Sequence, residues 1–87
     1  MYIILTYDIE QKRVGKMLKL CRRYLHWVQN SVFEGEITES KLKELIAEAK
    51  RIIDVSEDHV MIYKSRQKEW LEKEILGTEK VDIGVFL

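Results

Sequence analysis

The feature that most constrains the fold of this chain is the alternation of strand-like and helix-like hydrophobic patterns. The run from Tyr2 to Tyr7 is mostly apolar, and its length and composition are typical of a buried strand. The next segment changes to helical spacing, with apolar residues at Val14, Met17, Leu18, Cys21 and Leu25. A strand followed by an amphipathic helix indicates a domain in which helices pack on a sheet.

The rest of the chain repeats this alternation. Residues 25–33 favour one kinked strand or two short strands that end near Glu36, with a bulge near Asn30. Thr38 can cap a helix that stops about Asp54 and has apolar residues at Leu42, Leu45, Ile46, Ala49, Ile52 and Ile53. Two further strands are predicted, from His59 to Tyr63 and from Val81 to Leu87. Between them, residues 68–76 fit either a short helix or a strand.

This order of elements resembles a ferredoxin-like α+β sandwich, in which two helices cover one face of an antiparallel sheet. The chain has 87 residues, so we expect a single domain over residues 1–87. A core of this size gains stability from a partner, and the single cysteine excludes an internal disulfide. We expect a homodimer, because a terminal strand that ends at Leu87 leaves an edge for another chain to pair with.

Apolar runs in the sequence are far shorter than the ~18–20 residues that a membrane span needs. Met1 leads into Tyr2 with no basic leader segment and no cleavage site of small residues. We therefore expect a cytoplasmic protein that makes no membrane contact.

Charge is balanced overall but segregated along the chain. Fifteen basic and fifteen acidic residues cancel, which argues against a protein that coats nucleic acid by bulk charge. From Glu10 to Arg23, however, six basic residues accompany one acidic residue, and several of them share a face of the first predicted helix: Lys12, Lys16, Lys19 and Arg23. This face either holds a phosphate backbone without reading sequence or is an ordinary solvated surface, and the pattern fits both.

Asp8 stands where the first strand gives way to the first helix, and two interpretations are open. With Gln11 three residues later, Asp8 has the spacing of a capping box. Alternatively, Asp8 binds Mg²⁺, which proteins hold with only one or two carboxylates. A two-fold dimer would supply a second Asp8 and place the ion on the symmetry axis.

Other chemical groups give weaker signals. The two histidines, His26 and His59, have no cysteine or second histidine at metal-ligand spacing, so no zinc site is predicted. His26 is a weak candidate base, and Cys21 lies on the apolar side of its helix, where packing is the simpler role.

Several motifs together resemble the small CRISPR-associated endoribonuclease family, which supplies the small subunit of the spacer-integration complex. They are Tyr7-Asp8-Ile9, then Arg13-Val14 and Lys16 at the start of the first helix, Tyr24 at its end, and the run from Val28 to Gly35, VQNSVFEG. Trp27 departs from the basic residue that members often carry before the VQ pair. We therefore expect any nuclease activity to be modest.

The resemblance implies a homodimer whose last strand crosses to the partner's sheet, with Asp8 from both subunits at a Mg²⁺ site. It makes Asp8 the catalytic metal ligand, Tyr7 its neighbour and Arg13 a nucleic-acid contact, with Ser31 and Phe33 lining the same cleft. The family divides between Mg²⁺-dependent cleavage of single-stranded RNA or duplex DNA and an architectural role that bridges dimers of the CRISPR integrase subunit. An alternative resemblance is to a toxin-like ribonuclease similar to virulence-associated protein D, which shares the fold and the aspartate at the strand end.

Overall fold

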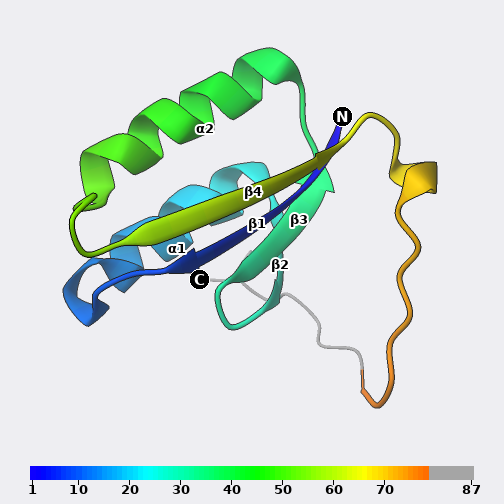
Figure 1. Ribbon diagram of the computed structural model, residues 1–87, viewed down its shortest axis with the longest axis horizontal. Helices are drawn as coiled ribbons and strands as arrows, with labels where there is room; N and C mark the ends of the chain where they lie inside the picture. Colours follow the sequence, from blue (N-terminus) through cyan, green and yellow to red (C-terminus); the bar gives the residue numbers. More distant parts are fainter. Residues whose placement is uncertain (79–87) are drawn as a thin grey trace.

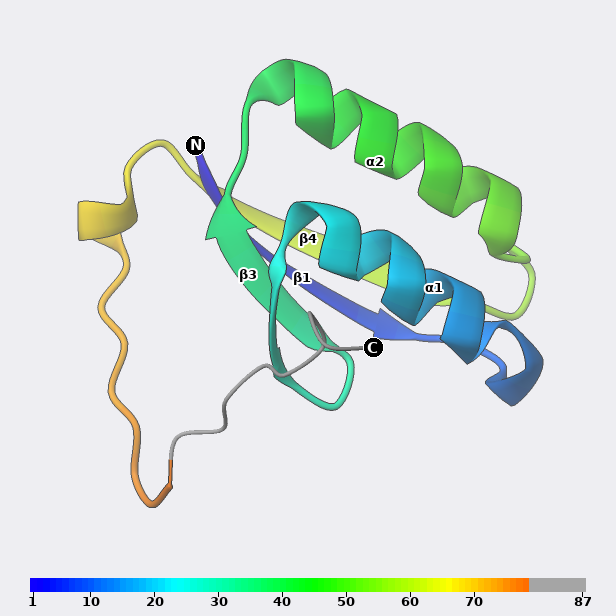
Figure 2. The same ribbon diagram turned by 180° about the vertical axis from the view of Figure 1, so that it is seen from behind.

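A computed structural model describes residues 1–78 as one four-stranded antiparallel sheet with two helices on one of its faces (Figures 1 and 2). The strand order is β2-β3-β1-β4. The elements, in chain order, are β1 (Tyr2–Asp8), α1 (Gln11–Tyr24), β2 (His26–Gln29), β3 (Val32–Glu36), α2 (Glu39–Ile52) and β4 (His59–Ser65). This arrangement confirms the predicted ferredoxin-like sandwich.

The core lies between the sheet and the helices. Side chains of β1 alternate between the two faces, and Ile3, Leu5 and Tyr7 are buried on the side of the helices. There they join Phe33 of β3 and buried residues of both helices, among them Met17, Leu20, Cys21, Leu42 and Leu45. The predicted apolar faces are therefore confirmed, with Leu20 as an addition.

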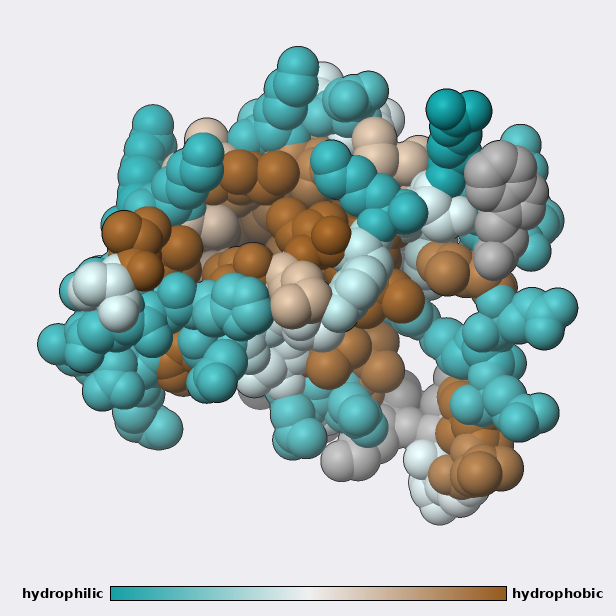
Figure 3. Space-filling model, viewed as in Figure 1, coloured by the Kyte–Doolittle hydropathy of each residue, from teal (hydrophilic) through white to brown (hydrophobic). Residues whose placement is uncertain are grey.

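Within residues 1–78, neither α-helix packs on the other side of the sheet, which we call the open face. Its residues on β1 are Tyr2, Ile4, Thr6 and Asp8, which stand opposite Ser65, Tyr63, Met61 and His59 of β4. The space-filling view shows apolar side chains over the middle of the molecule, surrounded by hydrophilic ones (Figure 3). Tyr63 is 56% exposed and Met61 38%, so this face presents apolar surface to solvent.

Residues 25–36 form a hairpin, which matches the predicted alternative of two short strands. Asn30 turns the chain with a positive φ of 39°, a conformation that asparagine adopts more readily than most residues. The expected irregularity lies slightly earlier, because the register between β2 and β3 shifts between Trp27 and Gln29.

Helix α2 begins as predicted. The Oγ1 atom of Thr38 accepts a hydrogen bond of 3.1 Å from the backbone N–H of Lys41, which satisfies a donor in the first turn. Among residues 1–78, no helix is long and apolar enough to cross a membrane.

The chain after β4 has little regular structure. One 3₁₀ turn covers Lys68–Trp70, and residues 71–78 continue without helix or strand, so neither alternative for residues 68–76 describes the whole segment. The predicted strand Val81 to Leu87 lies outside the described residues.

Candidate functional site

Asp8 is the last residue of β1, and its side chain is exposed on the open face. Its neighbour across the β1–β4 ladder is His59, the first residue of β4 and also exposed. Among the described residues, none donates a hydrogen bond to the carboxylate of Asp8 or forms an ion pair with it. The carboxylate therefore remains available to a ligand that approaches the open face.

The capping-box interpretation of Asp8 is wrong. Helix α1 begins at Gln11, its N-cap residue is Glu10, and no side chain caps it in that position. Asp8 belongs to the strand and is two residues too early to cap this helix. The local pattern was misleading because two residues that belong to neither element, Ile9 and Glu10, separate the strand from the helix.

A distant residue, Asp58, holds the start of α1 instead. Its Oδ1 accepts hydrogen bonds from the backbone N–H of Glu10 at 2.9 Å and from Nη2 of Arg13 at 3.0 Å. Its Oδ2 accepts from Nε of Arg13 at 2.6 Å and from the backbone N–H of Asp54 at 2.8 Å. We call this bidentate ion pair the Arg13–Asp58 clamp.

The clamp shifts the titration of both partners. The hydrogen bond to the Asp58 carboxylate raises the pKa of Arg13 above its usual range. The same hydrogen bond, with those from the backbone of Asp54 and Glu10, holds the pKa of Asp58 well below its usual range, against the effect of desolvation. The side chain of Asp58 has no exposed surface and that of Arg13 is 15% exposed, so the guanidinium predicted to contact nucleic acid is largely engaged within the chain.

Of the residues predicted to bind nucleic acid in the first strand and the hairpin, Tyr7 and Phe33 are buried and Ser31 is partly exposed. Tyr7 is 7% exposed and its ring stacks on Phe33, which is fully buried, at a centroid distance of 6.1 Å. The backbone N–H of Tyr7 donates a hydrogen bond of 3.1 Å to the carbonyl of Ser31, which is partly exposed. Tyr7 and Phe33 thus support the end of the sheet from the core, and Ser31 is the member of this group nearest to solvent.

The three predicted lysines of α1 are exposed, unlike Arg13. Lys12 lies in the first turn, while Lys16 and Lys19 line a groove of about 420 Å³ between the two helices. We call it the basic groove; its lining is completed by Leu20, Arg23, Glu48, Arg51 and Ile52. Because it lies between the helices, it is separated from Asp8 on the open face, and one chain does not bring these lysines and Asp8 together.

Part of the positive charge of the basic groove is neutralised by a glutamate that also lines it. Arg23 forms an ion pair with Glu48, which also accepts a hydrogen bond of 3.3 Å from the hydroxyl of Tyr24. Lys16, Lys19 and Arg51 have no such partner among residues 1–78. These three cations give the groove its excess positive charge, and Arg51 was not among the predicted binding residues.

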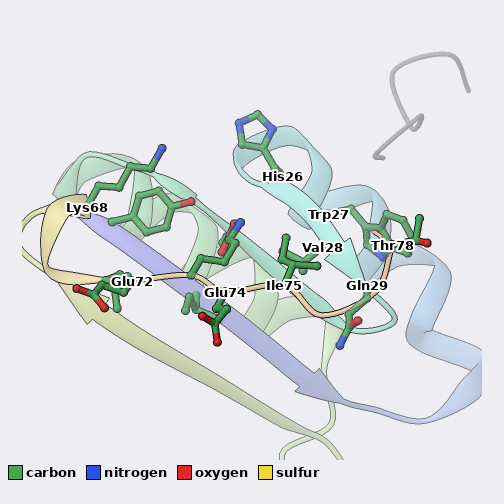
Figure 4. Close-up of a pocket in the computed structure, with 14 residues that line it drawn as sticks. His26, Trp27, Val28, Gln29, Lys68, Glu72, Glu74, Ile75 and Thr78 are labelled. Carbon is green, nitrogen blue, oxygen red and sulfur yellow. The ribbon is translucent and has the colours of Figure 1, made fainter. Parts of the chain in front are cut away.

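A second cavity, of about 690 Å³, lies on the open face between the sheet and the segment after β4. Figure 4 shows this segment, with Ile75 and Thr78, running across the face of the sheet close to Val28 and Gln29 of the hairpin. An ion pair between Lys73 and Glu34 fastens the segment to β3.

Metal ligands are sparse in the described part of the chain. Within the described residues, no group of three or more His, Cys, Asp or Glu side chains could hold a metal ion. A carboxylate such as Asp8 nonetheless fits Mg²⁺, because water and substrate phosphate oxygens commonly complete its coordination. The donor chemistry is therefore compatible with a Mg²⁺ site that a second subunit or a substrate completes.

Comparison with known proteins places the chain in a family. A family model described as CRISPR associated protein Cas2 matches residues 1–73. The CRISPR-associated endoribonucleases Cas2 of Dictyoglomus turgidum and Thermotoga maritima are 49% and 46% identical to the chain, over 92% and 97% of each sequence. A crystal structure of Cas2 superimposes with a TM-score of 0.85 at 40% identity, covering 95% of this chain and 93% of the other.

Proposed function

The chain belongs to the Cas2 family of CRISPR-associated proteins, and we propose that it acts in CRISPR adaptation as a homodimer that binds nucleic acid and bridges dimers of the integrase subunit. We further propose Mg²⁺-dependent endonuclease activity centred on Asp8, with single-stranded RNA or duplex DNA as substrate. The family assignment favours this role over that of a toxin-like ribonuclease.

The observation that carries the proposal is the position of Asp8 at the end of a central strand, with its side chain exposed on the face of the sheet opposite the two helices. Two such faces packed together would remove Met61 and Tyr63 from solvent and bring two copies of Asp8 to one interface. The order β2-β3-β1-β4 makes β4 an edge strand of the described sheet, so its outer side could accept a strand from the partner.

Each part of the chain has a separate task in this proposal. Asp8 would hold Mg²⁺, which when bound polarises a phosphodiester and assists ionisation of an attacking water. The Arg13–Asp58 clamp keeps the strand end that carries Asp8 in a fixed position. Lys16 and Lys19 attract the phosphate backbone to the outer, helical side, where contacts with phosphates carry no sequence information.

The bridging role is tested by integration of a duplex into a repeat sequence by the cognate integrase subunit, with and without this protein. We expect integration to require the protein and to continue with Asp8→Asn, because bridging depends on the dimer and not on the metal ligand. Equal integration in the absence of the protein would contradict the bridging role.

The homodimer is tested by light scattering on the full chain at tens of micromolar. We expect the mass of a dimer, and we expect deletion of Val81 to Leu87 to leave monomer or aggregate. A monomeric full-length protein would contradict both the dimer and a metal site shared between two subunits.

A further inference from the structure

Asp8 and His59 are far apart in sequence but directly opposite in the sheet. They are Cα partners in the antiparallel β1–β4 ladder, so their side chains project from the same open face. Directly opposite residues have Cβ atoms about 4.5–5.5 Å apart. Both side chains are exposed, and no hydrogen bond or ion pair between them is formed, so their donor atoms can meet at a common ligand.

The Arg13–Asp58 clamp fixes the backbone on both sides of this pair. Asp58 immediately precedes His59, and it accepts a hydrogen bond from the backbone N–H of Glu10, two residues after Asp8. The buried carboxylate of Asp58 also binds Asp54 and Arg13, which anchors the start of β4 to α1. Arg13 is therefore a positioning residue for Asp8 and His59.

We propose that His59 is a second protein ligand beside Asp8, which makes this a mixed nitrogen and oxygen site that prefers Co²⁺, Ni²⁺ or Zn²⁺ to Mg²⁺. Imidazole nitrogen suits these borderline ions, whereas Mg²⁺ takes oxygen ligands almost exclusively. This inference rests on the proposed metal-binding role of Asp8, but not on any cleavage activity.

The other histidine provides a matched control. His26 also stands opposite a carboxylate, because it is the Cα partner of Glu34 in the β2–β3 ladder. That carboxylate, however, is paired with Lys73 and its side chain is only 12% exposed. His26 therefore has the same type of neighbour without a free carboxylate, and it should not take part in metal binding.

The test is titration of the full-length, tag-free protein with Co²⁺ and, separately, with Mg²⁺, followed by calorimetry and by the visible absorption of Co²⁺. Wild type should bind Co²⁺ more tightly than Mg²⁺. His59→Asn should weaken Co²⁺ binding about tenfold or more, because the loss of a direct ligand should cost at least as much as the loss of a group that only orients a ligand. Its Mg²⁺ affinity should stay within about twofold of wild type, since Mg²⁺ relies on oxygen ligands. His26→Asn should leave both affinities unchanged, and Asp8→Asn should weaken both.

Several results would overturn the assignment. They are unchanged Co²⁺ binding by His59→Asn, an equal loss in His26→Asn, unchanged Co²⁺ binding by Asp8→Asn, or no preference of wild type for Co²⁺. Melting without metal checks that each variant is folded, and His59→Gln provides a second substitution if His59→Asn is not. A protein that binds Co²⁺ as described but cleaves no nucleic acid would contradict the proposed catalysis and leave this ligand assignment intact.

Discussion

Reversing the charge of Lys16 and Lys19 together tests whether the basic groove holds a phosphate backbone. Both lysines are exposed, line the groove and have no ion-pair partner among the described residues. Each phosphate contact on duplex DNA contributes about 0.9 to the slope of log affinity against log salt, so loss of two contacts should reduce that slope by about 1.8. The same two contacts account for a roughly 12-fold loss of wild-type affinity on raising salt from about 50 to about 200 mM.

The assay is a filter-binding titration of Lys16→Glu/Lys19→Glu on several duplex sequences at a series of salt concentrations. At about 0.1 M salt the loss of counterion release alone should weaken binding roughly 60-fold, and by a similar factor for every sequence. Lys43→Glu/Lys64→Glu is the control, because it makes the same change in net charge at two exposed lysines outside the groove. Equal losses in both double variants, or an unchanged slope in the groove variant, would refute the groove as the binding surface.

Two further predictions concern the parts of the fold that support the site. Because the pKa of Asp58 is lowered in the folded state, the clamp should stabilise the protein fully above the unfolded pKa of about 3.9 and lose this effect as pH falls towards the lower folded value. The stability difference between wild type and Asp58→Asn, from urea melts at fixed protein concentration, should therefore shrink below about pH 4; a constant difference down to about pH 2 would contradict this reasoning. Thr38→Ala should lower the free energy of unfolding by about 1 kcal/mol, whereas Thr38→Ser should keep most of the stability that the cap contributes. Equal stability of all three proteins in urea would argue against the cap.

Much of the fold follows from local patterns in the sequence. The apolar period and the Thr38 cap define α2, and the apolar run after Met1 defines β1, because each depends on residues close together in the chain. For the hairpin, the sequence fits either one kinked strand or two short strands, since the distinction depends on the backbone conformation of Asn30. Asparagine permits the left-handed turn there without requiring it.

The candidate site was less predictable because its contacts join distant parts of the chain. Arg13 and Asp58 are 45 residues apart, and nothing near either residue indicates their pairing. The proximity of Asp8 and His59 depends on the register between β1 and β4, which no local spacing of metal ligands reveals. By contrast, the exposure of Lys12, Lys16 and Lys19 follows from the helical period of α1.

The central claim is that Asp8 serves as a metal ligand, and Asp8→Asn tests it most directly. The measurement is a time course of cleavage of single-stranded RNA and duplex DNA, with Mg²⁺ and with EDTA, by wild type and by the variant. We predict modest Mg²⁺-dependent cleavage by wild type, none by Asp8→Asn, and nearly equal melting temperatures without metal, because the exposed carboxylate does not cap α1. Equal cleavage by both proteins, whether or not Mg²⁺ is present, would contradict the claim.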